Sequence, residues 1–344
     1  MRKIIEVFLL LVVCSCTNKL PQKPTEHFDE VRVIEPIRTI ELEEYDILQP
    51  DEFVRYKEWY VFLEIGEGNQ VKFLNVDSNK VIEGVRIGQG PLEVYGFSTI
   101  DVIDDSLCVI GYNQKKILVL DVEEDGLKIT SRKTNRLVRP ICFIDNERYI
   151  ESGWEDSCIC RVFDLKGEKL SMLPYPQGVS LSEYEYLYQN SIYKNTLYAV
   201  SPDKTKYAFG LRYIQMMGFG SIVRDSLTLD KLYEYAPILI YDFVPGESPQ
   251  IAPAKNNISN IMAVFGTEDY VGFIYSGARY DDFVTFGRSI LLYKWDGTPY
   301  IRLDVDDNLK YALYDKDRNV IIAISYTPEA KLVEYDMTGI IDVD

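Results

Sequence analysis

The chain is nearly devoid of histidine: His27 is the only one in 344 residues, and it lies close to the N-terminus. A Ser-His-Asp or Cys-His nucleophile system needs a histidine to take up the proton of the nucleophile. Many zinc sites also use histidine as a ligand. These classes of hydrolase and metal centre are therefore excluded for the body of the chain.

Cysteine is scarce as well. Two residues, Cys108 and Cys142, lie in apolar runs, where a small buried thiol is the expected role. Cys158 and Cys160 would point to the same face of one strand. Thiolate metal sites normally use four ligands, and no other ligand cluster accompanies this pair, so a structural role is favoured. Whether the pair forms disulfides stays open.

Basic residues are too few to balance the acids. The chain has 37 Lys and Arg against 54 Asp and Glu, a formal net charge of -17. Such a surface repels the phosphates of nucleic acids and anionic lipid headgroups. DNA and RNA are therefore excluded as partners.

No apolar run is long enough to span a membrane. The longest near the start, Val7 to Val13, is far shorter than the ~20 residues that a spanning helix needs. It follows Arg2 and Lys3, as in a secretory signal. Ser15 before Cys16 resembles the bacterial lipobox, so residues 1–15 are interpreted as a lipoprotein signal peptide and Cys16 as the lipidated residue. A plain signal peptide is the alternative.

The predicted domains follow from this start. Residues 16–30 are expected to be the lipidated Cys16 and a flexible tether, because they hold two prolines and little apolar pattern. Membrane contact is expected only through the lipid anchor. Residues 31–344 are expected to fold as one all-β domain, because 26 tyrosines, 15 phenylalanines and short β-branched runs between turn residues are typical of strands.

One local pattern recurs six times: an apolar strand that ends near an aspartate and a turn, followed by another strand. The aspartates are Asp77, Asp121, Asp164, Asp242, Asp296 and Asp336. Three of the spacings, 44, 43 and 40 residues, match the ~40 to 50 residues of a four-stranded propeller blade. The 78-residue gap after Asp164 could hide a seventh blade, but one blade with an insertion is preferred.

The predicted fold is a six-bladed β-propeller of four-stranded blades. The last repeat ends too early to supply a fourth strand, whereas Val31 to Asp46 is an unassigned strand at the other end. An N-terminal strand is therefore expected to pair with the last blade and close the ring, because an open ring would leave an unpaired edge.

The stretch VRIGQGPLEVYGF, starting at Val85, is predicted to be a corner between blades. Gly88 and Gly90 permit unusual backbone angles, Pro91 fixes a turn, and Glu93 can accept hydrogen bonds from loop N–H groups. The alternative, a phosphate-binding loop, would need a helix after it, and a strand pattern follows.

Residues 88–94, GQGPLEV, resemble the Gly-x-Gly-Pro-Gly-Glu-Phe motif found between blades in the six-bladed propeller lipoproteins of Bacteroidota, described as TolB-like or NHL-like. Leu92 and Val94 depart from that motif. The resemblance implies a cell-envelope protein. Because no acidic run follows Cys16, it also implies an outer-membrane lipoprotein that faces the periplasm, with the cell surface as the alternative.

The favoured function is non-catalytic binding or scaffolding, with an envelope protein or a polysaccharide as partner and a monomeric chain. A candidate binding loop carries Tyr175, Tyr184, Tyr186 and Tyr188. The first alternative is a calcium-dependent hydrolase or lactonase with carboxylates on the propeller axis, since calcium needs six to eight oxygen ligands; otherwise no cofactor is expected. Candidate carboxylates are Asp51, Glu52, Asp101, Asp145, Asp203 and Asp269. A polysaccharide lyase or glycosidase is the second alternative.

Overall fold

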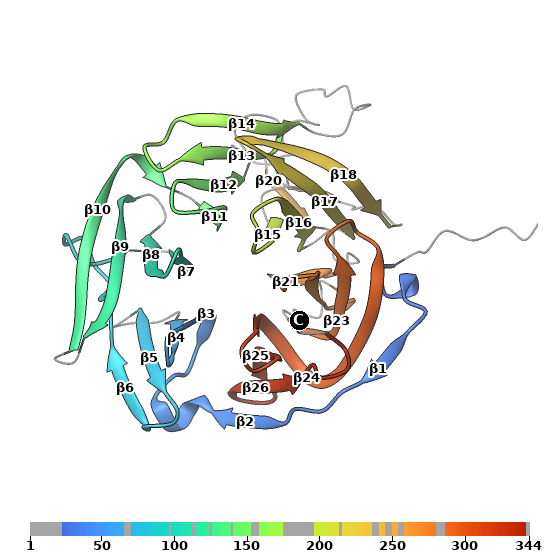
Figure 1. Ribbon diagram of the computed structural model, residues 1–344, viewed down its shortest axis with the longest axis horizontal. Coiled ribbons are helices and arrows are strands. Elements are labelled where there is room, and N and C mark those ends of the chain that lie inside the picture. Colours follow the sequence, from blue (N-terminus) through green and yellow to red (C-terminus); the bar gives the residue numbers. More distant parts are fainter. Residues whose placement is uncertain are drawn as a thin grey trace, which may run out of the picture.

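The computed structural model shows a ring of antiparallel β-sheets (Figure 1). It describes residues 23–64, 70–95, 98–111, 114–123, 126–138, 140–152, 158–174, 196–212, 215–235, 241–244, 250–253, 258–279 and 286–341. The predicted all-β propeller fold is confirmed. Within these ranges no helix has the length and apolar character needed to cross a membrane.

Four sheets of the ring are separate blades of four antiparallel strands. The first contains β3 (Pro50–Tyr56), β4 (Trp59–Glu64), β5 (Val71–Asn75) and β6 (Lys80–Glu83). The second contains β7 (Ser98–Ile103), β8 (Ser106–Gly111), β9 (Gln114–Glu123) and β10 (Gly126–Val138). The third contains β11 (Pro140–Phe143), β12 (Arg148–Ser152), β13 (Cys158–Asp164) and β14 (Lys169–Pro174). The fourth contains β15 (Thr196–Val200), β16 (Lys206–Leu211), β17 (Met216–Val223) and β18 (Ser226–Glu234).

The rest of the ring is one continuous eight-stranded sheet, so the prediction of six separate four-stranded blades is wrong. Its strands are β1 (Val31–Val33), β2 (Arg38–Glu41), β21 (Ile261–Gly266), β22 (Tyr270–Tyr275), β23 (Gly287–Lys294), β24 (Pro299–Asp315), β25 (Val320–Tyr326) and β26 (Ala330–Asp336). A separate hairpin of β19 (Tyr241–Val244) and β20 (Gln250–Pro253) completes the described strands.

The sheet is continuous because strand β24 pairs with two neighbouring strands, β23 and β25. Its first half pairs with β23 and its second half, from Leu309, pairs with β25. The residues between the halves, around Asp306, include neither glycine nor proline, the residues that most strongly interrupt a strand. The backbone therefore stays extended, whereas six separate blades would require a break between the strands of neighbouring blades.

The 78-residue gap contains the fourth sheet, whereas the repeat at Asp242 forms the separate hairpin of β19 and β20 and is not part of a blade. The strands of the fourth sheet were missed because glycines interrupt their apolar pattern. A Cβ on Gly218 would lie 2.1 Å from the ring of Phe209, and one on Gly220 would lie 2.1 Å from the carbonyl oxygen of Thr228. These glycines leave room for large neighbours, so a weak strand signal accompanies a tightly packed sheet.

The N-terminal segment lies against the outer margin of the ring. We call residues 23–41 the strap; it contains the 3-10 helix η1 (Pro24–His27), β1 and β2. β1 pairs parallel with β24, and β2 pairs antiparallel with β26. Pro36 separates these two strands, because proline has no N–H to donate. The closing strand is thus shorter than the expected Val31 to Asp46, and a second 3-10 helix, η2 (Leu42–Tyr45), follows it.

The described part of the expected tether, from Lys23 to Glu30, packs on the protein. Pro24 and Thr25 are buried. The ring of Phe28 is 8% exposed and lies 4.9 Å from the ring of Tyr293, edge-on. Phe28 thereby joins a core cluster made by the fourth sheet and the eight-stranded sheet.

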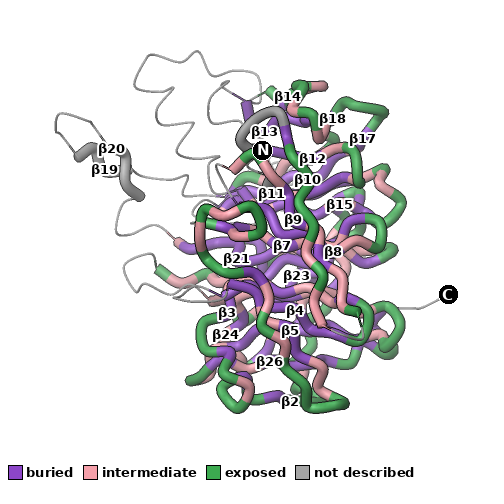
Figure 2. The backbone as a smooth tube through the Cα atoms, turned by 90° about the vertical axis from the view of Figure 1, so that its left-hand side faces the viewer, coloured by how far each residue is buried: buried purple, intermediate pink, exposed green. Residues whose placement is uncertain are grey.

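Most buried residues lie on the strands, and exposed residues are concentrated in turns and outer strands (Figure 2). Cys108, Cys158 and Cys160 are buried, Cys142 is half-buried, and all four are free thiols.

Candidate functional site

A cavity lies at the centre of the ring, where the innermost strands of the sheets face one another. Its volume is about 430 Å³. The walls come mainly from β3, β7, β11, β15, β21 and the second half of β24. Chain segments more than 250 residues apart in sequence therefore share one site.

Four of the six carboxylates proposed from the sequence line this cavity: Asp51, Glu52, Asp101 and Asp145. Asp203 and Asp269 are exposed and are not part of its lining. The sequence suggested these residues only as scattered acids. Ring closure brings the four together, because each lies on or directly after the inner strand of its sheet.

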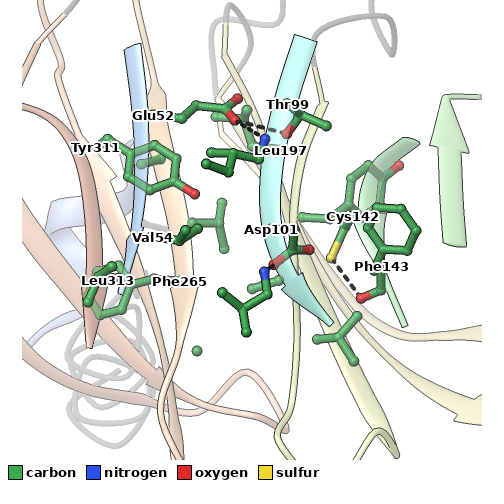
Figure 3. Close-up of a pocket in the computed structure, with 18 of the residues that line it drawn as sticks. Glu52, Val54, Thr99, Asp101, Cys142, Phe143, Leu197, Phe265, Tyr311 and Leu313 are labelled. Carbon is green, nitrogen blue, oxygen red and sulfur yellow. Dashed lines mark hydrogen bonds between the residues drawn. The ribbon is translucent and has the colours of Figure 1, made fainter. Parts of the chain in front are cut away.

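Glu52, on β3, connects two sheets. Its Oε2 atom accepts a hydrogen bond from the Thr99 hydroxyl at 2.8 Å and one from the backbone N–H of Ile100 at 3.4 Å, both on β7 (Figure 3). Burial, together with the negative charge of Asp51, raises the pKa of Glu52 to about 7. This carboxyl therefore gains and loses its proton near neutral pH.

Asp101, on β7, makes a similar connection to the next sheet. It accepts hydrogen bonds from the backbone N–H groups of Val102 and Phe143. Burial outweighs these bonds and raises the pKa of Asp101 to about 6. Cys142, beside it on β11, has a thiol pKa far above its usual range, because burial disfavours the thiolate. A thiol in this state is a poor nucleophile.

Tyr311, on β24, faces the two carboxyls across the cavity (Figure 3). Burial and the negative charges of Glu52 and Asp101 raise the pKa of its hydroxyl well above the usual value, so the phenol stays neutral. At the margin, Lys310 pairs with Asp51 at 2.7 Å and Lys204 with Asp104 at 2.6 Å. The cavity thus offers carboxyl and phenol groups among apolar walls that include Val54, Leu197 and Leu313.

No group of three or more His, Cys, Asp or Glu side chains suited to holding a metal ion occurs within the described ranges. Glu52 and Asp101 are the carboxyls that could contribute to such a site from the cavity walls. Chemically, the pair can bind a cationic or hydroxyl-bearing group and can exchange protons near pH 6 to 7.

The predicted blade corner is a turn between β6 and β7. The N–H of Gly90 donates to Oε2 of Glu93 at 2.8 Å, and the N–H of Gly88 donates to the carbonyl oxygen of Val94 at 2.7 Å. A Cβ on Gly88 would lie 2.1 Å from the same Glu93 oxygen. Pro91 is exposed. This loop lies apart from the central cavity, and β7 is the next described element after it.

The other predicted site residues lie outside the described residues: Cys16, Tyr175, Tyr184, Tyr186 and Tyr188. Thr99, Cys142 and Tyr311 were not predicted from the sequence as cavity residues. A signal was present, because each is a polar or polarisable residue next to apolar ones in a strand: Thr99 in β7, Cys142 in β11 and Tyr311 in β24. Without the ring, nothing in the sequence indicates which of these strands is innermost.

The two raised carboxyl pKa values predict that stability falls as pH rises. Between about pH 4.5, where an unfolded glutamate titrates, and about 7, the folded chain holds more protons than the unfolded chain. The free energy of unfolding then decreases with rising pH. We expect a loss of a few kcal/mol across this window, on the order of 3 kcal/mol from Glu52 alone, measured by urea unfolding at each pH.

Glu52→Gln should remove the slope between about pH 6 and 7 and leave only the part that Asp101 contributes at lower pH, because glutamine does not titrate but keeps an oxygen that can accept the bond from Thr99. Glu43→Gln, on the exposed surface of η2, is the matched control and should leave the slope unchanged. Equal slopes for the wild type and Glu52→Gln would contradict the assignment.

Comparison with known proteins supports the fold but identifies no family. No protein-family model matches the chain, and no curated protein matches it. The crystal structure of the β-propeller domain of Cps50 (Swd1) from Myceliophteria thermophila covers 88% of this chain and 99% of its own, with a TM-score of 0.50 and 7% sequence identity. The structure of U3-55K covers 87% of this chain and 99% of its own, with a TM-score of 0.48 and 11% identity. At these identities the likeness to the Cps50 domain shows the β-propeller fold alone.

Proposed function

We propose that this chain is a non-catalytic binding propeller of the bacterial cell envelope, anchored by lipid on Cys16 and facing the periplasm. The central cavity is the observation that carries the binding role. It places Glu52, Asp101 and Tyr311 among apolar walls, the mixture typical of ligand sites. The signal segment and lipobox support the anchor, and the GQGPLEV motif supports the relation to Bacteroidota lipoproteins.

The cavity volume suits a unit of a larger partner. A space of about 430 Å³ falls within the range of small-molecule sites, so it can admit a sugar unit or one side chain of an envelope protein. Rigid inner strands position the polar groups, and this arrangement lowers the entropic cost of binding.

The test is calorimetry of the chain with envelope oligosaccharides and with envelope peptides. A ligand that binds the wild type should bind the Glu52→Gln, Asp101→Asn double variant roughly tenfold to a hundredfold more weakly, since bonds to charged groups contribute about 1.5–3 kcal/mol. The Glu43→Gln variant should bind as the wild type does.

Equal affinity of the double variant and the wild type would exclude the cavity as the binding site. A separate arm titrates calcium after chelation, with thermal unfolding in parallel. Micromolar calcium binding together with turnover of lactone or ester substrates would replace the binding role with a calcium-dependent hydrolase.

A further inference from the structure

The strap carries the most exposed apolar side chains in the described part of the chain. Val33 is 76% exposed and Ile37 is 63% exposed; Val31, on the same strand as Val33, is 46% exposed. Pro36, beside Ile37, is exposed as well. Aliphatic groups that are close together and open to water mark a contact surface.

The inner side of the strap is firmly attached to the propeller, so these side chains have a fixed direction. The ring of His27 lies edge-on to Tyr233 at 4.5 Å, and Phe28 is buried in the core. Further along, the N–H of Ile34 donates to the carbonyl oxygen of Asp304 at 3.0 Å, and that of Ile37 donates to Glu334 at 2.7 Å. The strap runs along the outer margin of the ring (Figure 1).

The short chain segment before the strap limits how far the strap can lie from a lipid on Cys16. Only residues 17–23 separate Cys16 from Pro24. Even fully extended, this segment spans at most about 28 Å, and a flexible chain of that length spans about 15 Å on average. If Cys16 is lipidated, as the proposed function requires, the start of the strap is held close to the bilayer.

We propose that the strap side of the rim faces the lipid bilayer, with Val31, Val33 and Ile37 in contact with its headgroup region. Burial of these side chains at the interface is favourable. The ring would then stand on its edge, because the strap follows the margin. Both faces of the ring, and the central cavity between them, would stay accessible to a periplasmic partner.

Charges on the strap define the lipid that suits it. The guanidinium of Arg32 lies 2.6 Å from Glu30, and Arg38 is 40% exposed at its side chain; both can donate to lipid phosphate. The strap as a whole is acidic and is repelled by anionic headgroups. Its exposed acids, Glu26, Asp29, Glu30, Glu35 and Glu41, outnumber its exposed bases, Lys23, Arg32 and Arg38. The contact is therefore expected to be strongest on zwitterionic lipid and to weaken as the anionic fraction rises.

The test is photo-crosslinking of the full lipidated chain in phosphatidylcholine vesicles, with benzoylphenylalanine replacing Val33 in one sample and Val81 in another. Val81 is a matched control, because it is also an exposed valine, 36% exposed, on the outer strand of another blade. We expect lipid adducts roughly tenfold more abundant from position 33 than from position 81, because only the anchored side reaches the interface.

The outcomes separate the orientation from the anchor. Mass spectrometry of the Cys16 peptide reports lipidation in the same sample. A lipidated chain with equal adduct yields at positions 33 and 81 would overturn the orientation alone, whereas a chain without lipid would overturn the anchor and the orientation together. The Cys16→Ser chain should lose the lipid adducts at position 33. A full yield of these adducts from that chain would show that the lipid on Cys16 does not hold the strap at the bilayer.

Discussion

Deletion of the strap, residues 23–41, is expected to lower the free energy of unfolding by more than about 5 kcal/mol, enough to unfold a typical domain. The deletion removes Phe28 from the core and β2 from the edge of β26. It also removes Ile40, which is 7% exposed in the cluster shared by the first blade and the eight-stranded sheet. Calorimetric unfolding should show loss of the whole transition, because every sheet of the ring depends on its neighbours.

The control keeps the backbone of the strap and changes only its outward side chains. The double variant Val33→Ser, Ile37→Ser should unfold within about 0.5 kcal/mol of the wild type in solution, because exposed residues contribute little. A deletion variant with an unchanged unfolding temperature would show that the strap is not part of the folded ring.

Substitution of Glu334 by alanine is expected to cost about 2–3 kcal/mol of stability, because hydrogen bonds to a charged group contribute about 1.5–3 kcal/mol. The partner left behind, Arg318, is 34% exposed at its side chain and keeps its pair with Asp315. Glu334, on β26, is 3% exposed. It accepts two bonds from Arg318 at 3.0 Å and one from the Tyr60 hydroxyl at 2.9 Å. Tyr60 belongs to the first blade, so this carboxylate joins the two ends of the ring.

Denaturant unfolding of Glu334→Ala gives the free energy, and Glu123→Gln is the control. Glu123 forms a 2.8 Å pair with Lys128 in which both side chains are at least half exposed, and such pairs contribute less than about 1 kcal/mol. If the two variants lose equal stability, Glu334 does not hold the ring together.

The fold class could be predicted from the sequence because its signals are local. Apolar runs followed by aspartates and turns mark hairpins, as at Asp77 between β5 and β6. The continuity of β24 was not predictable in the same way, because an uninterrupted strand and two strands joined by a short turn share one apolar pattern. The fourth sheet was missed because Gly218 and Gly220 weaken its pattern while improving its packing.

The site could be predicted only in part, because it depends on distant residues. Asp51, Glu52, Asp101 and Asp145 were plausible candidates as acids, but Asp203 and Asp269 looked equivalent to them. Only the closed ring determines which strands are innermost and therefore which acids face the axis. Tyr311 follows Glu52 by more than 250 residues, and no local pattern connects them.

The central claim, that the cavity on the propeller axis binds a partner in the envelope, is tested most directly by crosslinking in intact cells. Benzoylphenylalanine replaces Arg212, which lines the cavity and is half-buried, and replaces Val81 as the control. The account predicts one discrete adduct from position 212, absent from position 81 and reduced when Glu52→Gln and Asp101→Asn are added. Adducts of equal pattern from both positions, or an adduct from position 212 that the two added substitutions leave unchanged, would contradict it.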